Sequence, residues 1–267
     1  MSHVKTMLAV DSRRLFRSRF FWIMAGICFV IPVLILVMTT MMDGSVSVDP
    51  KTGIETVTKG FDNVWQIISS TSGSGMSMDM GMTSMCNLNL LYFLIAVLVG
   101  VFVSQDFRSG FSKNIFTVRA KKESYVISKT LICSLGAMAM LLCFVVGSFL
   151  GGAIAGLSFE MSGFSAGNLV LCILTKLLLS PIFVAISLCF SVIAKDKTWL
   201  SILLSMMVGM FLFMMIPMMT PLNAGLMNVI LCLAGSVLFS LALGLVSNLV
   251  LKKTAWNAYR LAQQGRS

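Results

Sequence analysis

Long apolar runs alternate with short polar segments along most of the chain, and this pattern sets its layout. A helix needs about 20 apolar residues to cross the hydrocarbon core of a bilayer. Four runs of this kind come first, over residues 20–42, 88–104, 130–157 and 168–194. The sequence predicts a transmembrane helix for each of them.

The last apolar run is too long for one crossing. Residues 198–251 carry no charge, and as a single helix they would be about 80 Å long. Two prolines and a glycine within residues 217–225 disfavour continued helix. The run therefore predicts two spans, over residues 199–216 and 227–250. The expected fold is an all-α integral membrane protein with six transmembrane helices in a single domain, residues 1–267.

Composition agrees with this layout, because the chain is 57% hydrophobic and only 11% charged, with a mean hydropathy of +0.94. A soluble domain is about a quarter charged. Most of the 20 basic residues fall in residues 1–19, 105–129, 195–197 and 252–267. The positive-inside rule then places both termini and the loop 105–129 in the cytoplasm, and residues 43–87 outside. The net charge of +10 indicates contact with anionic lipid headgroups and not with nucleic acid.

The N-terminal segment has a moderately amphipathic pattern. Val4, Met7, Leu8 and Leu15 can share one helical face, and Asp11 interrupts that apolar stripe. The pattern predicts an N-terminal amphipathic surface helix on the inner leaflet. The alternative is a basic flank that only fixes the topology.

The outer loop, residues 43–87, is too long for a simple connection. Residues 60–70 (GFDNVWQIISS) favour a short amphipathic helix, and a methionine-rich stretch follows it. Thioethers can bind Cu(I), or they can form an adaptable surface for apolar ligands. Because the chain has 22 methionines in all, we predict no metal site and keep Met76, Met78 and Met80 as substrate-path candidates. The seven cysteines are scattered and are expected to pack as small apolar residues.

Two features within the spans bear on packing and function. Gly147 and Gly151 are four residues apart, as are Gly152 and Gly156, and this spacing lets helices approach closely. Lys176 is the single charge inside a predicted span, where a lysine costs about 3 kcal/mol. Its side chain either extends toward the outer surface or faces an internal cavity as a second kind of substrate-path candidate.

The most polar internal segment is SQDFRSGFSKNIFTVRAKKESYVISK, residues 104–129, with six basic and two acidic residues. It continues the second span, bends near Gly110, and restarts a helix that returns to the membrane. Gly110 allows either a bend or a close backbone approach. Phe102, Phe107, Phe111 and Ile115 can project together. A charged helix–bend–helix with exposed aromatic residues is typical of a docking element for a cytosolic partner.

This segment resembles the inner loop of type 2 ABC exporter permeases, including those of bacterial peptide or antibiotic export and bacteriocin immunity. In that family an acidic residue precedes a Gly-Thr pair, a Lys/Asn-rich turn, a basic segment, a Tyr and a Lys. The matching residues here are Asp106, Gly110, Lys113, Asn114, Ile115, Tyr125 and Lys129. Phe111 stands where threonine is usual, and VRAKKES replaces the commoner Ser-Arg ending.

The resemblance implies that a coupling helix in this loop, residues 105–129, sits in a groove on a separate ATPase subunit. The expected partner contacts are Asp106, Phe107, Arg108, Gly110, Phe111, Lys113, Asn114 and Ile115. The chain has no GxxxxGK[ST] phosphate loop, so ATP and Mg²⁺ are expected on the partner and no cofactor on this chain. The resemblance also implies two ATPase subunits, a second permease chain and a bacterial cell membrane.

The function predicted from these features is export of an amphipathic or hydrophobic cargo, such as a peptide, an antimicrobial or a lipid. Two alternatives stay open: an ion-coupled secondary transporter, and a non-transporting immunity or sensor protein that binds a peptide at residues 43–87. An enzyme is the least favoured class, because the sequence has one histidine, His3, and no nucleophile–base pair.

Overall fold

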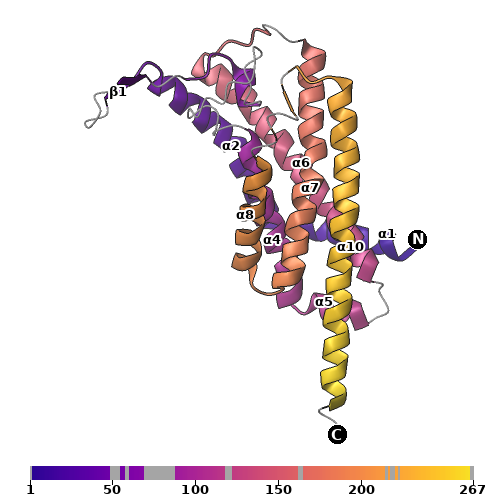
Figure 1. The fold of residues 1–267 in the computed structure, drawn as a ribbon. Coiled ribbons are helices and arrows are strands. Elements are labelled where there is room, and N and C mark those ends of the chain that lie inside the picture. The colour runs from indigo at the N-terminus through magenta and orange to yellow at the C-terminus, as the bar shows by residue number, and fades with distance from the viewer. Residues whose placement is uncertain are drawn as a thin grey trace.

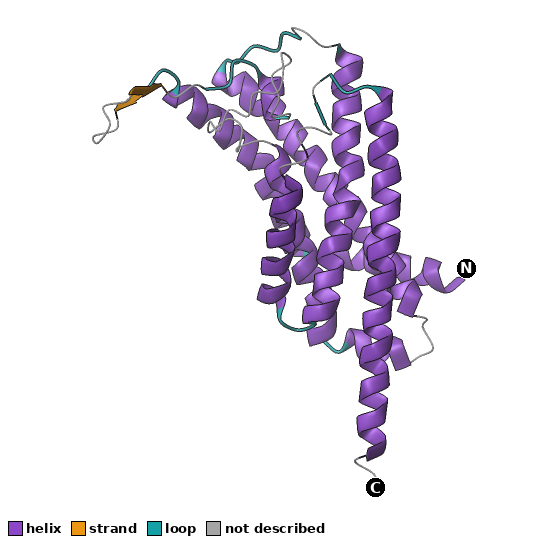
Figure 2. Cartoon of the chain, viewed as in Figure 1, coloured by secondary structure: helices purple, strands orange, loops and turns teal. Residues whose placement is uncertain are grey.

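The computed structural model describes residues 2–48, 55–57, 60–68, 88–117, 122–161, 165–213, 216, 220–221 and 223–264. Its helices are α1 (Ser2–Phe16), α2 (Arg19–Met42), α4 (Leu91–Arg108), α5 (Phe111–Thr117), α6 (Lys122–Ala155), α7 (Ala166–Ala194), α8 (Thr198–Phe213) and α10 (Leu226–Gln264) (Figure 1). Two 3₁₀ turns are η1 (Val64–Ile67) and η2 (Leu88–Leu90), and strands β1 (Val46–Val48) and β2 (Glu55–Val57) form an antiparallel hairpin. The described chain is thus almost entirely helical (Figure 2).

Five of the described helices are long and apolar enough to cross a membrane. They are α2, α6, α7, the segment Leu88–Arg108 and the segment Leu226–Lys253 of α10. These confirm five of the predicted spans as helices of spanning length. The remaining one corresponds to α8, which is apolar but has 16 residues in the described part. At that length it covers about 24 Å, less than the roughly 30 Å of the hydrocarbon core.

The tightest helix pair is α2 against α6, and glycines make it possible. A Cβ atom on Gly151 would lie 2.8 Å from the Val33 Cα, and one on Gly147 would collide with the Phe29 carbonyl oxygen. The prediction that this glycine pair allows close approach is confirmed. Gly156 has a different role. It follows Ala155, the last residue of α6, and its φ is +69°. A glycine in the left-handed region commonly ends a helix in this way.

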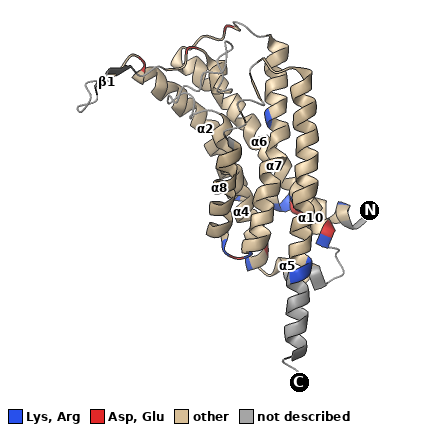
Figure 3. Cartoon of the chain, in the orientation of Figure 1, with Lys and Arg blue, Asp and Glu red and all other residues tan. Residues whose placement is uncertain are grey.

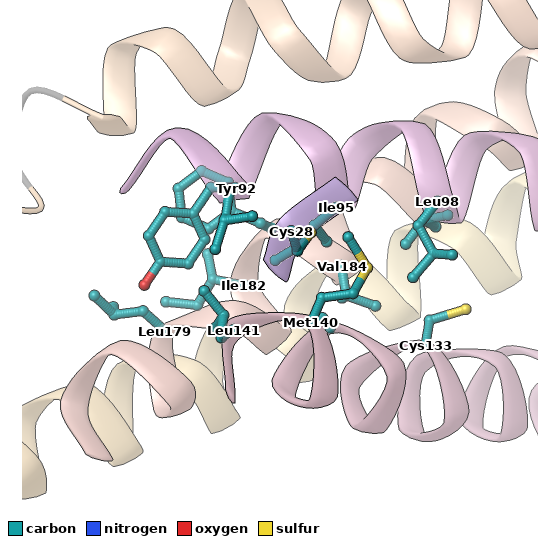
Figure 4. Packing of buried hydrophobic residues seen from close by; sticks show 14 of the residues in the cluster. Cys28, Tyr92, Ile95, Leu98, Cys133, Met140, Leu141, Leu179, Ile182 and Val184 are labelled. Atoms are coloured by element: carbon teal, nitrogen blue, oxygen red, sulfur yellow. The ribbon is translucent and has the colours of Figure 1, made fainter. Parts of the chain in front are cut away.

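The centre of the bundle lies between α4, α6 and α7. Figure 4 shows Tyr92, Ile95 and Leu98 of α4 packed with Met140 and Leu141 of α6 and with Leu179, Ile182 and Val184 of α7. The edge helix α10 differs, since most of its apolar side chains are exposed, among them Leu226, Leu238 and Leu249. Its exposed apolar side chains suit contact with lipid tails.

The structure describes six of the seven cysteines but none of the three methionines that were proposed for the substrate path. Six cysteines are free and buried or half-buried, which fits their predicted packing role, and Cys86 lies outside the described residues. Within the described ranges, no three His, Cys, Asp or Glu side chains are grouped as metal ligands. Met76, Met78 and Met80 lie outside the described residues, so their predicted role stays a prediction.

Residues 60–68 of the predicted outer loop fold onto the ends of α2 and α6, whereas the β1–β2 hairpin projects away from the bundle (Figure 1). The predicted short helix is present as the 3₁₀ turn η1. The Trp65 ring of η1 packs edge-on against Phe149 and Phe159. The Gly60 N–H donates to the Asp43 carboxylate at the end of α2, 2.8 Å away. This segment therefore covers the end of the bundle opposite to α5.

Candidate docking site and its buried support

The α4–α5 junction is a sharp elbow that projects from one end of the bundle (Figure 1). The Ser109 N–H donates to the Gln105 carbonyl at the end of α4, and Gly110 has a φ of +73°. A Cβ atom on Gly110 would meet nothing within 4 Å. Within the described chain, Gly110 therefore serves the bend and makes no close backbone approach.

The predicted contact residues divide by exposure. Arg108 and Asn114 are exposed, while Phe107, Gly110, Phe111 and Ile115 are half-buried. The side chain of Lys113 lies outside the description. The Arg108 Nε donates to the Asp196 carbonyl oxygen, 2.9 Å away, and so ties the elbow to the α7–α8 turn. The outer surface of the elbow is therefore formed by the end of α4 and by α5.

Asp106 requires a correction, because the structure places it behind this surface and not on it. Its side chain is fully buried. Its carboxylate pairs with the Arg14 Nη1 at 2.8 Å and the Lys129 Nζ at 2.7 Å, and it accepts a hydrogen bond from the Tyr125 hydroxyl at 3.1 Å. Both carboxylate oxygens thus face groups of the same chain, and a direct contact between Asp106 and a partner is not available in this conformation.

The ion pairs continue beyond Asp106 into a four-charge cluster. Lys129 also pairs with Asp11, with 2.8 Å between Nζ and Oδ1, and the Ser128 hydroxyl donates to Asp11 Oδ2 at 2.7 Å. Asp11, Lys129 and Asp106 are each at most 1% exposed, and the Arg14 side chain is 29% exposed. The order Asp11, Lys129, Asp106, Arg14 alternates in sign and has no net charge. Such balance is what burial of charges requires, since an unpaired buried charge is costly.

Aromatic rings surround the two cations of this cluster. The Arg14 guanidinium lies 4.0 Å from the Phe111 ring centroid, and the Lys129 ammonium lies 4.0 Å from that of Phe102. Both distances fall in the range of cation–π attraction. Phe102 is buried in the core, so it supports the cluster and does not project with Phe111 toward a partner. Two of the helices that carry the cluster, α4 and α6, belong to the bundle, and the third is α1.

Sequence reasoning missed the contribution of α1 to this site. Asp11 was visible only as an interruption of the apolar stripe, and Arg14 only as one basic residue among several. The interruption was the usable signal, because an acidic residue on the buried face of an amphipathic helix needs a basic partner. That partner, Lys129, is more than one hundred residues away in sequence, and only the fold brings it close.

Residues 13–213, well over half of the chain, match the sequence pattern of the family described as ABC-2 family transporter protein. The chain belongs to the ABC-2 family. An ABC-2 protein is the membrane permease of an ABC transporter and associates with an ABC ATPase subunit. No curated protein and no solved structure matches the chain significantly. The matched range contains the elbow and every member of the charge cluster except Asp11.

A second buried lysine of this ABC-2 permease lies near the opposite end of the bundle. Lys176 is 1% exposed, and its Nζ donates to Asn89 Oδ1 at 2.6 Å and Thr220 Oγ1 at 3.0 Å. The Tyr92 hydroxyl donates to the Lys176 carbonyl oxygen at 2.9 Å. Among the described residues, no carboxylate forms an ion pair with Lys176. The alternative in which its head group reaches the outer surface is wrong for this conformation, because the ammonium group is enclosed between α7, η2 and Thr220.

Proposed function

We propose that this ABC-2 permease is the membrane-spanning subunit of an ATP-driven exporter, which moves an amphipathic or hydrophobic cargo out of the cell. The observation that carries the proposal is the α4–α5 elbow. It presents a short helix at one end of an apolar bundle and rests on a buried cluster of ion pairs. A short projecting helix held by buried ion pairs can receive force from a separate protein and pass it into the bundle.

We propose the following topology for the chain. The elbow, the α7–α8 turn and the continuation of α10 share one end of the bundle, which is taken as cytoplasmic (Figure 1). Lys and Arg residues gather toward this end in the described part (Figure 3), which supports the assignment by the positive-inside rule. In this arrangement α8 is part of a sixth span, both termini are inside, α1 lies along the inner leaflet, and the membrane is a bacterial cell membrane.

The proposed partners follow from how the permease would be driven. Hydrolysis takes place on two cytosolic ATPase subunits, which bind ATP and Mg²⁺, because the chain itself has no phosphate-binding loop. Each permease chain supplies one elbow, so two ATPase subunits require a second permease chain. The direct contacts proposed for the ATPase are Phe107, Arg108, Phe111, Asn114 and Ile115, with Gly110 shaping the elbow. Lys113 is kept among the proposed contacts on the basis of the sequence alone.

The proposed cargo route passes near Lys176 at the outer half of the bundle. A cation that contacts only neutral oxygens among the described residues can still attract an anionic or strongly polar group of a cargo. The methionines Met76, Met78 and Met80 are kept as candidates for the outer part of the route. Suitable cargoes are amphipathic peptides, antimicrobial compounds and lipids.

Co-purification and transport together test this function. The tagged permease should bring down an ATPase subunit, and the complex in liposomes should move a fluorescent amphipathic peptide or a fluorescent phospholipid only with ATP. Asn114→Trp, on the exposed face of α5, should weaken ATPase binding at least tenfold. Asn223→Trp is the matched control, because Asn223 is also exposed but lies at the other end of the bundle. Transport driven by an ion gradient without any ATPase would contradict the proposal and favour a secondary transporter.

A further inference from the structure

The N-terminal helix α1 is joined to the elbow more firmly than a surface helix requires. Two of its residues, Asp11 and Arg14, lie one turn apart and both enter the buried charge cluster. We propose that Arg14 of α1 is a positioning residue that holds α5 in a fixed orientation relative to α4, and that movement of the elbow reaches the bundle only when this contact is intact. This inference rests on the proposed ATP-driven function and adds a part to it.

Arg14 contacts both sides of the hinge at Gly110. On the α4 side its guanidinium pairs with Asp106 at 2.8 Å, and on the α5 side it lies 4.0 Å from the Phe111 ring centroid. A glycine with a φ of +73° and open space around its Cα does little to fix the angle between the two helices. The side chain of Arg14 supplies the missing restraint, because rotation of α5 about Gly110 would pull Phe111 away from the guanidinium.

Lys129 carries the connection from the elbow into the bundle. It pairs with Asp106 of α4 and Asp11 of α1, and it belongs to α6, a helix of 34 residues. The glycine face of α6 packs along α2 at Gly147 and Gly151. A displacement of α5 is therefore passed through Arg14, Asp106 and Lys129 to α6, and along α6 to the middle of α2.

The alternating order of the charges makes this joint resistant to slipping. If α1 moved along α6 by one residue, at least one of the buried charges would lose its partner, which is strongly unfavourable. Apolar contacts alone would permit such sliding at lower cost, because they are not directional. The cluster thus favours movement of α1, the elbow and the inner end of α6 as one unit.

The test compares Arg14→Met with Arg13→Met in the permease–ATPase complex. Methionine at position 14 keeps a long side chain against Phe111, and Asp106 keeps Lys129 and Tyr125 as partners, so the protein is expected to fold. Arg13 is exposed on the same helix and has the same formal charge, which makes it the matched control. If Arg14→Met does not fold, Arg14→Lys takes its place and should also lose the shift, because lysine keeps the ion pair with Asp106 and removes the guanidinium that lies over the Phe111 ring.

The readout is the ATP-induced change in distance between spin labels at the exposed positions Met41 of α2 and Met227 of α10. Labelled chains are diluted with unlabelled ones so that only distances within one chain are measured. We expect wild type and Arg13→Met to show the shift, and Arg14→Met to hydrolyse ATP with the shift lost. A normal shift in both variants would overturn this inference alone. Absence of any ATP-dependent shift in the wild-type complex would instead overturn the proposed function.

Discussion

Lys129 and Lys176 are both fully buried, and the two ends of the permease treat them in opposite ways. Near the elbow, Lys129 pairs with two carboxylates at 2.8 and 2.7 Å. Near the opposite end, Lys176 donates to two neutral oxygens at 2.6 and 3.0 Å. A carboxylate compensates a buried cation fully, whereas neutral oxygens only partly replace its hydration. The charge of Lys129 is therefore balanced by its neighbours, whereas no carboxylate among the described residues pairs with Lys176, and this contrast underlies the different roles proposed for the two lysines.

Among the substitutions that test the contrast between the two lysines, Lys129→Met should have the largest effect on the free energy of unfolding. The substitution leaves Asp11 without its ion pair and Asp106 with Arg14 alone. Leaving a buried charge uncompensated typically costs about 3–5 kcal/mol. The free energy of unfolding, measured by denaturant titration in detergent, should fall by this amount. Lys253→Met is the control, since Lys253 is exposed and its loss should change stability by no more than about 0.5 kcal/mol. Equal effects of the two substitutions would contradict the structural role of the cluster.

The two ends can also be compared through a glycine from each. Gly110 and Gly225 both have open space for a Cβ atom, but only Gly110 has a positive φ. Gly110→Ala should therefore lower the free energy of unfolding by about 1 kcal/mol and reduce ATP-dependent transport. Gly225→Ala should leave both quantities near the wild-type values. If the two variants behaved alike, the bend at Gly110 would not be what shapes the elbow.

Apart from the control variants, the smallest expected change in stability comes from Lys176→Met. The substitution leaves the Asn89 and Thr220 acceptors without this donor, but it also removes a buried charge, and the two effects oppose each other. The net change in the free energy of unfolding should be within about 1 kcal/mol, whereas transport of the fluorescent probe should fall. A loss of stability as large as that of Lys129→Met would show that both lysines are structural, and the contrast between them would fail.

The sequence predicted the helices of the bundle well, because apolar runs of membrane-spanning length have few other stable conformations. The extension of the helices beyond the apolar runs was also predicted. The helix α6 begins at Lys122, eight residues before the predicted span, which agrees with the expectation that the segment after Gly110 restarts a helix before it enters the membrane. The hydropathy pattern marks the end of an apolar run, whereas the helix extends beyond that run into charged residues.

The direction in which a charged side chain points could not be read from the sequence. Asp106 was expected on the docking surface from its match to the acidic residue of the family's inner loop, but its environment depends on Arg14 and Lys129 from two other helices. The choice between the two roles of Lys176 depended in the same way on Asn89 and Thr220. In both cases the deciding neighbours are far away in sequence. The three residues Asp106, Tyr125 and Lys129, which carried part of the family resemblance, meet in space.

The most direct test of the account is the side of the membrane from which residue 114 is reached. Asn114→Cys is introduced together with Cys86→Ser, because the other six cysteines are buried or half-buried, and cells are treated with a membrane-impermeant maleimide. We expect residue 114 to be modified only after the cells are permeabilised, and to be protected when the ATPase is co-expressed. Modification of residue 114 in intact cells would place the elbow outside and would contradict the proposal that it receives force from a cytosolic ATPase.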